Sequence, residues 1–240
     1  MSDNVLLLGC GSYLGRSYAS YLLSKGHLVG GTFSCKESAI KSDLSSHTNF
    51  SAFIVNIEDP DNFSVVIDDI CSVFSVDKLV SFWGFHSINP FRTTKINELS
   101  KSFLHNVSAN IEFVRLLLRK CKSVNSVVFT SSVAGVKPEK GLLSYAIAKS
   151  ALISATQVLA LELARSKVRV NCISPGWIKS PAALKSSKRL NVDLDVLNGL
   201  YPLGTGVFEY LINSYDLLLF SKEGWITGQN IVVDGGWTLS

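Results

Sequence analysis

Residues 5–15 have the sequence Val-Leu-Leu-Leu-Gly-Cys-Gly-Ser-Tyr-Leu-Gly. The apolar run 5–8 is typical of a strand that is buried on both faces, as in a parallel sheet. Residues 16–24 place Tyr18, Ala19, Leu22 and Leu23 on one side of a predicted helix. The glycines therefore lie between a strand and a helix, where backbone N–H groups can bind a pyrophosphate. This context favours a nucleotide-binding turn over a plain tight turn.

The same alternation of strands and helices continues along the chain. It predicts an α/β fold, a single-domain Rossmann fold with a doubly wound parallel sheet of about seven strands and helices on both faces. The sequence has no linker or internal repeat, so residues 1–240 are predicted to form one domain. The helix over 96–120 is predicted to bury one stripe, formed by Leu99, Phe103, Val107, Ile111, Val114 and Leu118. The other predicted strands are 26–33, 52–57, 78–84, 127–130, 168–173 and 226–233, and the other predicted helices are 63–73 and 145–164.

Composition excludes several classes of protein. With 47% hydrophobic and 18% charged residues the chain resembles a soluble globule, and its longest apolar runs are too short to span a membrane. The net charge of +4 is spread out without interleaved aromatic residues, which argues against a nucleic-acid partner. The four histidines offer no metal-ligand spacing. The five cysteines contain no C-x-x-C pair, which predicts free thiols and a cytoplasmic location.

A hydroxyl, a phenol and a cation are placed close together by the segment 131–149. Tyr145 and Lys149 stand four residues apart, so a helix brings them to one face. Ser132 lies just past the predicted strand 127–130. Such a set can move a proton on and off a carbonyl oxygen. A Tyr-x-x-x-Lys spacing alone is also typical of an exposed helical pair, so other segments must decide between the two.

Those segments resemble the short-chain dehydrogenase/reductase family from Val5 to Trp237. Ser132, Tyr145 and Lys149 fall at its catalytic spacing, and Asn106 matches its fourth catalytic position. Residues 171–178 resemble the segment that closes over the nicotinamide, and residues 225–236 are similar to the C-terminal strand. Residues 201–204 are typical of 3-oxoacyl-carrier-protein reductases and polyol dehydrogenases. The resemblance implies a homo-oligomer, a tetramer or dimer, with the helices over 96–120 and 145–164 as contact faces.

The resemblance also implies a role for each site residue. Tyr145 would exchange the proton, Lys149 would lower the pKa of that phenol and bind the ribose, and Ser132 would hold the carbonyl oxygen. Asn106 would support a proton-carrying water. His86 and Trp177 would line the substrate pocket with Ser132 and Tyr145, under a lid at about 180–201. Besides Tyr145 and Lys149, the cofactor residues would be Gly9, Ser12, Tyr13, Leu14, Gly15, Ser34, Asn56, Ile57, Trp83, Gly84, Pro175, Gly176, Ile178 and Ser180.

Two departures from the family pattern concern the cofactor. Tyr13 stands where the middle glycine of the turn is expected and would crowd the pyrophosphate, unless Gly11 takes over part of the turn. Residues 81–84 are Ser-Phe-Trp-Gly where the family has Asn-Asn-Ala-Gly. The second predicted strand ends without an acid, and Ser34 and Lys36 follow it, which favours NADP(H) over NAD(H).

The sequence therefore predicts an NADP(H)-dependent reductase that converts a ketone to a secondary alcohol. The substrate would be a small-molecule or carrier-bound carbonyl compound, for example a 3-oxoacyl thioester. One alternative is an NAD-dependent polyol, sugar or hydroxysteroid-like alcohol dehydrogenase. The other is a cofactor-binding subunit without turnover, which the aromatic residues at 13, 82 and 83 suggest. No metal is expected.

Overall fold

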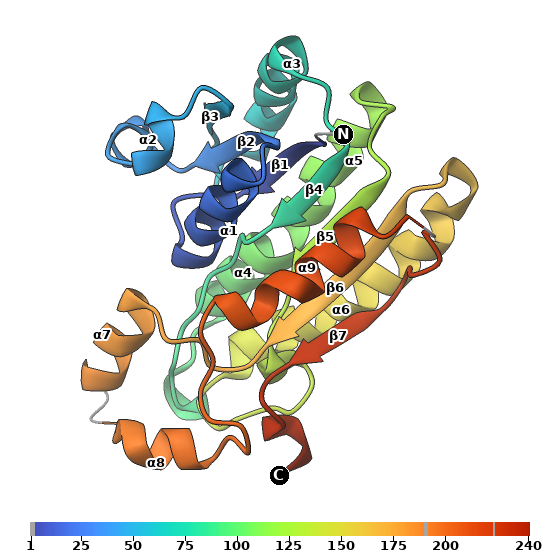
Figure 1. The fold of residues 1–240 in the computed structure, drawn as a ribbon. Coiled ribbons are helices and arrows are strands. Elements are labelled where there is room, and N and C mark those ends of the chain that lie inside the picture. Colours follow the sequence, from blue (N-terminus) through green and yellow to red (C-terminus); the bar gives the residue numbers. More distant parts are fainter. Residues whose placement is uncertain (1–2, 190–191, 223) are drawn as a thin grey trace.

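One parallel sheet organises the molecule (Figure 1). The computed structural model describes residues 3–189, 192–222 and 224–240. The strands are β1 (Asn4–Leu8), β2 (Leu28–Phe33), β3 (Phe50–Ile54), β4 (Lys78–Ser81), β5 (Ser126–Thr130), β6 (Arg169–Pro175) and β7 (Asn230–Val233). In the described part of the chain these seven strands have the order β3-β2-β1-β4-β5-β6-β7, and every neighbouring pair is parallel. The predicted doubly wound α/β sheet is confirmed.

Helices cover both faces of this sheet (Figure 1). They are α1 (Tyr13–Ser24), α2 (Lys36–Ile40), α3 (Phe63–Val73), α4 (Ile96–Phe103), α5 (Ala109–Lys120), α6 (Leu143–Leu163), α7 (Pro181–Arg189), α8 (Leu194–Gly199) and α9 (Glu209–Phe220). The helices α1 and α9 pack on one face, and α3, α5 and α6 pack on the other. The helices α7 and α8 lie beyond the carboxyl ends of the strands (Figure 1), where the lid was predicted. Leu190 and Asn191 of that predicted lid lie outside the described residues.

The first strand shows why both faces must be covered. Successive side chains of a strand point to opposite faces. Leu6 therefore packs in the same layer as Phe113 of α5, whereas Leu7 packs in the layer of Tyr18 of α1. Residues 5–8 are all fully buried. Each such leucine contributes about 1.5–3 kcal/mol to folding, so the apolar run is stable only between two helical layers.

The predicted helix over 96–120 is interrupted at Leu104–Ser108. This stretch has the wider winding of a π-helix and separates α4 from α5. A π-helical turn holds more residues than an α-helical one, so it rotates α4 relative to α5. The predicted apolar stripe is therefore wrong at Phe103, which is 43% exposed, whereas Val107 and Val114 are buried. The inner face carries polar side chains instead, which belong to the site described below.

The helix α6 corresponds to the helix predicted over 145–164. Together with the turn after it, Leu143–Ser166 is long and apolar enough to cross a membrane by length and composition alone. Core helices of soluble proteins pass the same test. In the structure α6 packs against β6 and the turn at Val133–Gly135, and its residues Leu152 and Ala160 are buried in the core. It is therefore a covering helix of the sheet.

Two of the five cysteines form a disulfide. Cys71 in α3 bonds to Cys121 after α5, with 6.8 Å between their Cα atoms, whereas Cys10, Cys35 and Cys172 are free. The prediction of free thiols is wrong for this pair, because α3 packs against α5 and joins residues 50 positions apart. No short cysteine motif indicates such a contact. The predicted cytoplasmic location rested on free thiols and loses that support.

We expect Cys71→Ser to lower the free energy of unfolding. A bond that closes a loop of 50 residues restricts the unfolded chain, which corresponds to about 4 kcal/mol. Thermal unfolding should show the same loss for the variant and for the wild type in reductant. Cys35→Ser is the control, because Cys35 is exposed and free. Alkylation of all five cysteines in the unreduced wild type would contradict the disulfide.

Candidate active site

A crevice lies at the carboxyl edge of the sheet, between β1 and β4. The order of the strands reverses there, since β2 and β3 continue to one side of β1 and β5 to β7 continue beyond β4. Ligands of open α/β sheets bind at such a point. The crevice contains a cavity of about 620 Å³, whose lining extends from Ser12 and Leu14 to Tyr145 and Lys149. The cation Arg16, which the sequence prediction did not include, also lines it.

The turn after β1 is held by a small set of hydrogen bonds. Gly9 has a left-handed φ of +92° and its N–H donates to Thr32 Oγ1 at 2.9 Å. Ser12 Oγ donates to the Gly9 carbonyl at 2.8 Å and accepts from the Gly15 N–H at 3.1 Å, which caps α1. A Cβ on Gly15 would lie 2.4 Å from the Gly9 oxygen. The strand and the helix therefore meet too closely for any larger residue.

Tyr13, which stands where the middle glycine of the turn was expected, is the first residue of α1. Its side chain is 37% exposed and lines the crevice. Gly11 has no positive φ, and a Cβ built on it would first meet Phe33 at 3.8 Å. Gly9 supplies the left-handed residue of the turn, while Gly11 lines the crevice, so the alternative in which Gly11 takes over part of the turn stays open. The predicted crowding by Tyr13 remains.

Gly15→Ala and Gly11→Ala are a matched pair for this turn. We expect Gly15→Ala to destabilise the protein and abolish cofactor binding, because its Cβ would clash with the Gly9 backbone. Gly11→Ala should keep both properties, since its Cβ makes only an ordinary contact. Thermal unfolding and fluorescence titration with NADPH measure the two effects. Equal losses in both variants would contradict the described turn.

Three of the predicted catalytic side chains meet at the other end of the crevice. Tyr145 and Lys149 lie one turn apart on α6, with Lys149 Nζ 5.6 Å from the centre of the Tyr145 ring. Ser132 follows β5 and its Oγ accepts a hydrogen bond from the Ala134 N–H at 3.2 Å. Ser132 also interacts with Tyr145 and acts on the pKa of its phenol. All three side chains line the same cavity.

Burial controls the charges at this end of the crevice. Lys149 is only 3% exposed, and burial lowers its pKa from 10.5 to about 8. Burial raises the pKa of Tyr145 above its ordinary value, and the interaction with Ser132 lowers it in part. The predicted lowering of the Tyr145 pKa by the lysine cation is therefore wrong. The ammonium group instead donates to the carbonyl of Thr130 at 2.8 Å.

We expect the stability cost of the buried Lys149 ammonium to depend on pH. Its folded pKa of about 8 lies below the ordinary 10.5, so the unfolded state binds more protons. The cost, about 3 kcal/mol, is present below the folded pKa and disappears as pH rises through the ordinary value. The melting temperature of Lys149→Met minus that of the wild type should therefore be largest near neutral pH and decrease in alkali. Lys41→Met, at an exposed lysine, is the control. A Lys149→Met difference that does not change with pH would contradict a buried ammonium.

Asn106 lies in the π-helical stretch and is fully buried. Its Nδ2 donates to the Phe85 carbonyl at 2.9 Å and to the Ser102 carbonyl at 2.8 Å, and its Oδ1 accepts from the Phe85 N–H at 3.3 Å. A Cβ on Gly84 would lie 2.8 Å from Asn106 Oδ1 and 3.2 Å from Lys149 Nζ. Asn106 therefore clamps the backbone after β4, and Gly84 lies between this amide and the lysine.

A second polar contact fixes the same loop. Ser81 Oγ hydrogen-bonds Asn110 Oδ1 and also accepts from the Trp83 N–H at 3.2 Å. Asn110 Nδ2 donates to the Asn106 carbonyl at 3.0 Å. The sequence prediction did not include Ser81, Ser102 or Asn110. Their signal is the four-residue spacing of Ser102, Asn106 and Asn110 on one face of a helix.

The two aromatic residues after β4 point to opposite layers of the core. Trp83 packs against Phe63 and Phe113, with ring centres 5.8 and 5.3 Å away. Phe82 packs against Tyr215 on the other side of the sheet, at 5.3 Å. Trp83 is 6% exposed although it borders the crevice. These residues therefore fill the core and do not occupy the crevice.

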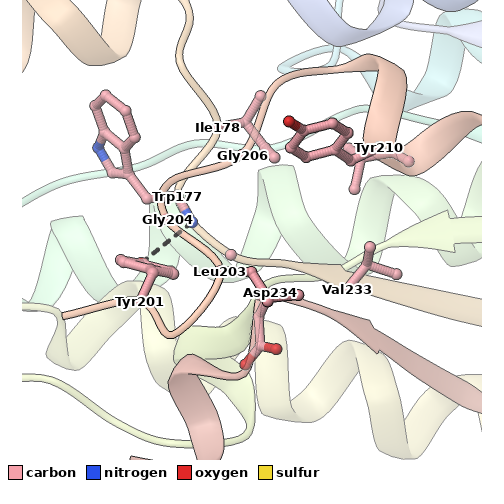
Figure 2. Close-up of a pocket in the computed structure, with 12 residues that line it drawn as sticks. Trp177, Ile178, Tyr201, Leu203, Gly204, Gly206, Tyr210, Val233 and Asp234 are labelled. Carbon is pink, nitrogen blue, oxygen red and sulfur yellow. Dashed lines mark hydrogen bonds between the residues drawn. The ribbon is translucent and has the colours of Figure 1, made fainter. Parts of the chain in front are cut away.

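The segment after β6 lies between three cavities and separates them. Pro175, Gly176, Ile178 and Ser180 line the crevice, and Ser180 Oγ accepts from the Ala183 N–H at 3.1 Å at the start of α7. On the reverse side Figure 2 shows a cavity of about 360 Å³, lined mostly by apolar side chains. There the Trp177 N–H donates to the Tyr201 hydroxyl at 3.2 Å.

A cavity of about 610 Å³ lies on the lid side of Ser132 and Tyr145. The predicted substrate residues His86 and Trp177 both line it. His86 packs edge-on against Tyr145 at 4.7 Å between ring centres. Burial and the nearby Lys149 lower the pKa of His86. This cavity and the crevice share Tyr145, so the phenol borders two neighbouring spaces.

Three of the predicted cofactor residues, Ser34, Asn56 and Ile57, do not line the crevice cavity. Ser34 follows β2 and is exposed. Asn56 is exposed, and its Oδ1 accepts from the Glu58 N–H at 3.0 Å. Ile57 packs partly buried against the core. Because β3 ends at Ile54 and not at 57, Asn56 and Ile57 belong to the loop that follows. Their contacts with the cofactor stay a prediction.

No group of three or more His, Cys, Asp or Glu side chains suited to a metal ion occurs among residues 3–189, 192–222 and 224–240.

Comparison with known proteins defines the class of this fold and site. A family model described as enoyl-(acyl carrier protein) reductase matches residues 12–238. The chain therefore belongs to the short-chain dehydrogenase/reductase family, which consists of oxidoreductases that act with NAD(P).

Relatives within that family match the chain over nearly its whole length. The 3-oxoacyl-[acyl-carrier-protein] reductase FabG of Buchnera aphidicola subsp. Schizaphis graminum is 29% identical over 236 residues, 96% of this chain and 95% of the relative. FabG of Escherichia coli is 27% identical over the same shares. Among solved structures, ElxO with NADP bound has a TM-score of 0.92 at 24% identity over 100% of both chains. NAD+-bound xylitol dehydrogenase has a TM-score of 0.91 at 21% identity over 98% of both chains.

Proposed function

We propose that this protein is an NADP(H)-dependent reductase that converts a ketone to a secondary alcohol. One observation carries the proposal: Ser132, Tyr145 and Lys149 line one end of a crevice whose other end is the glycine turn. A hydride donor held along the crevice would have its reactive ring beside a proton donor. The full-length similarity to FabG reductases supports the same reaction class.

The crevice fits a dinucleotide on the chemistry of its residues. The N-terminus of α1 supplies unpaired backbone N–H groups beside Ser12, and Arg16 adds a cation that lines the cavity. At the other end Gly84, Pro175, Gly176, Ile178 and Ser180 surround the position proposed for the nicotinamide. NADPH, when bound, supplies the hydride, which no side chain can provide.

Each catalytic side chain then has one role in the reaction. Ser132 donates a hydrogen bond to the substrate carbonyl oxygen, where negative charge develops. Tyr145 gives that oxygen its proton, and its raised pKa keeps the phenol protonated at neutral pH. Lys149 binds the ribose and, with a pKa of about 8, exchanges protons near neutral pH. Asn106 is a positioning residue that holds the loop beside Lys149.

The preference for NADP(H) rests on charge at the end of β2. No acidic residue stands in Thr32–Lys36, and an acid there would repel a ribose 2′-phosphate. Ser34 and Lys36 are exposed and available to such a phosphate. Fluorescence titration with NADPH and NADH tests this preference. Tenfold tighter binding of NADH would overturn it.

The favoured substrate is a 3-oxoacyl thioester, on a carrier or as a small molecule. The substrate cavity is lined by apolar side chains that include Val133, Leu142 and Leu197, and Lys140 stands at its edge. Apolar walls with a cationic rim suit an acyl chain attached to an anionic carrier. Measuring NADPH oxidation with acetoacetyl thioesters and with simple ketones tests this choice.

A polyol or sugar dehydrogenase is the second candidate. The carboxyl group of Glu139 lines the substrate cavity, where burial raises its pKa. Carboxyl groups accept hydrogen bonds from several hydroxyls, which a polyol offers. Oxidation of polyols with NAD+, at rates above those of thioester reduction, would favour this function.

We expect Tyr145→Phe to abolish turnover and to leave NADPH binding nearly unchanged. The substitution removes only the hydroxyl that donates the proton. Lys149→Ala should reduce both, since the ammonium is proposed to bind the cofactor as well. Steady-state rates and fluorescence titration separate the two effects. Wild-type activity in Tyr145→Phe would overturn the mechanism. Cofactor binding without turnover in the wild type on a broad carbonyl panel would favour a cofactor-binding subunit.

We also propose that the protein is a homo-oligomer, a tetramer or dimer. The outer face of α6 exposes apolar side chains, with Val158 51% and Leu161 80% exposed, and Phe103 of α4 is exposed as well. Apolar surface of this kind is typical of an interface between copies. Light scattering of the wild type and of Leu161→Glu tests it, with dissociation expected in the variant. A monomeric wild type would overturn it.

A further inference from the structure

The chain that leaves β6 changes its hydrogen-bond partner at Trp177. The Gly176 N–H still donates to the carbonyl of Val233, the last residue of β7, at 3.0 Å. Because β7 ends there, the next N–H needs another acceptor. The Trp177 N–H donates to the hydroxyl of Tyr201 at 3.2 Å, which Figure 2 shows as a dashed line. A phenol thus takes the place of a strand carbonyl at this one step.

Beyond Trp177 the backbone pairs with Gly206. The Gly206 N–H donates to the Trp177 carbonyl at 3.0 Å, and the Lys179 N–H donates to the Gly206 carbonyl at 2.8 Å. Successive residues of an extended chain turn their backbone groups to opposite sides. The N–H and the carbonyl of Ile178 therefore face away from Gly206. Ile178 lines the crevice, at the position proposed for the nicotinamide.

The ring of Tyr201 is held closely by its neighbours. It is 7% exposed and stacks on Trp237, with 6.0 Å between the ring centres. A Cβ on Gly176 would lie 3.1 Å from Cε1 of the ring and 2.9 Å from the Cα of Asp234. The absence of a side chain at Gly176 therefore lets the phenol approach the backbone of this segment. Burial raises the pKa of Tyr201, so the hydroxyl stays neutral at neutral pH.

The backbone at Tyr201 is tied to the end of α8. The Tyr201 N–H donates to the Asn198 carbonyl at 3.2 Å, and the Tyr201 carbonyl accepts from the Gly204 N–H at 2.8 Å. Asn198 Oδ1 also accepts from the Thr205 N–H at 2.8 Å. Leu197 of the same helix lines the substrate cavity, as Tyr201 does. The phenol therefore links a helix beside the substrate cavity to the segment beside the crevice.

We infer that Tyr201 is a positioning residue for the nicotinamide half of the cofactor, because its hydroxyl fixes the Trp177 N–H and thereby the backbone of Ile178. The inference rests on the proposed reductase function and adds a residue that acts on the cofactor through another. Without the hydroxyl, a partly buried N–H loses its acceptor, which is unfavourable unless the peptide unit rotates. Such a rotation moves Ile178, because the two peptide units meet at the Cα of Trp177.

The test compares Tyr201→Phe with the wild type, since this substitution keeps the ring and removes only the hydroxyl. We expect about tenfold weaker binding of NADPH by fluorescence titration, the size of effect that one lost hydrogen bond produces. The kcat for reduction of an acetoacetyl thioester should fall by about tenfold as well, because the hydride donor is less well oriented.

The adenosine half of the cofactor provides an internal reference. Calorimetric titration with 2′,5′-ADP, which has no nicotinamide, should give an affinity within about twofold of the wild type, because the glycine turn after β1 is unchanged. A merely structural loss in Tyr201→Phe would weaken both ligands equally. That result would overturn the inference.

Tyr210→Phe is the matched control, because Tyr210 lines the same cavity of about 360 Å³ as Tyr201 but is 65% exposed (Figure 2). It should keep wild-type values for both ligands and for kcat. Unchanged NADPH binding and kcat in Tyr201→Phe would overturn the inference and leave the reductase standing. A wild type that binds neither NADPH nor NADH would overturn the proposed function itself, and the inference with it.

Discussion

The end of the crevice that holds Ser132, Tyr145 and Lys149 depends on the hydrogen bonds between the Asn106 amide and the backbone of Phe85. Both a carbonyl and an N–H of the loop after β4 are bound by one buried side chain. Because Gly84 is packed between that amide and Lys149, a shift of the loop would displace the lysine. The π-helical winding at Leu104–Ser108 places Asn106 where it can do this. The geometry of the helix and the position of the loop after β4 therefore depend on each other.

That constraint explains how the family pattern can change after β4. Where the family pattern has Asn-Asn-Ala, this chain has Ser81, Phe82 and Trp83, and the two aromatic side chains fill the two layers of the core. The polar contacts that remain come from the helix side, through Asn106 and Asn110, and from Ser81. Apolar packing and hydrogen bonds of amide side chains thus both hold the loop in place. The substitution of polar by aromatic residues leaves the crevice open.

The sequence was sufficient to predict the sheet and the meeting of Ser132, Tyr145 and Lys149 in one cavity, because both depend on spacing along the chain. The strand–helix alternation predicted the parallel sheet, and the helix predicted over 63–73 coincides with α3. The π-helical stretch was not predictable, since it shifts backbone hydrogen bonds without a residue signature. The Cys71–Cys121 bond depends on how two helices pack. The pKa of Tyr145 depends on its burial and on the hydrogen bond of Lys149 to the Thr130 carbonyl.

The burial of Trp83 gives the molecule an internal optical reporter. Its indole is held between Phe63 and Phe113 and borders the crevice, while Trp225 is 92% exposed and far more accessible to quenchers in water. An indole shielded in this way emits at shorter wavelength than one in solvent. Reduced nicotinamide absorbs in that range, so energy transfer from Trp83 would report occupancy of the crevice without any label.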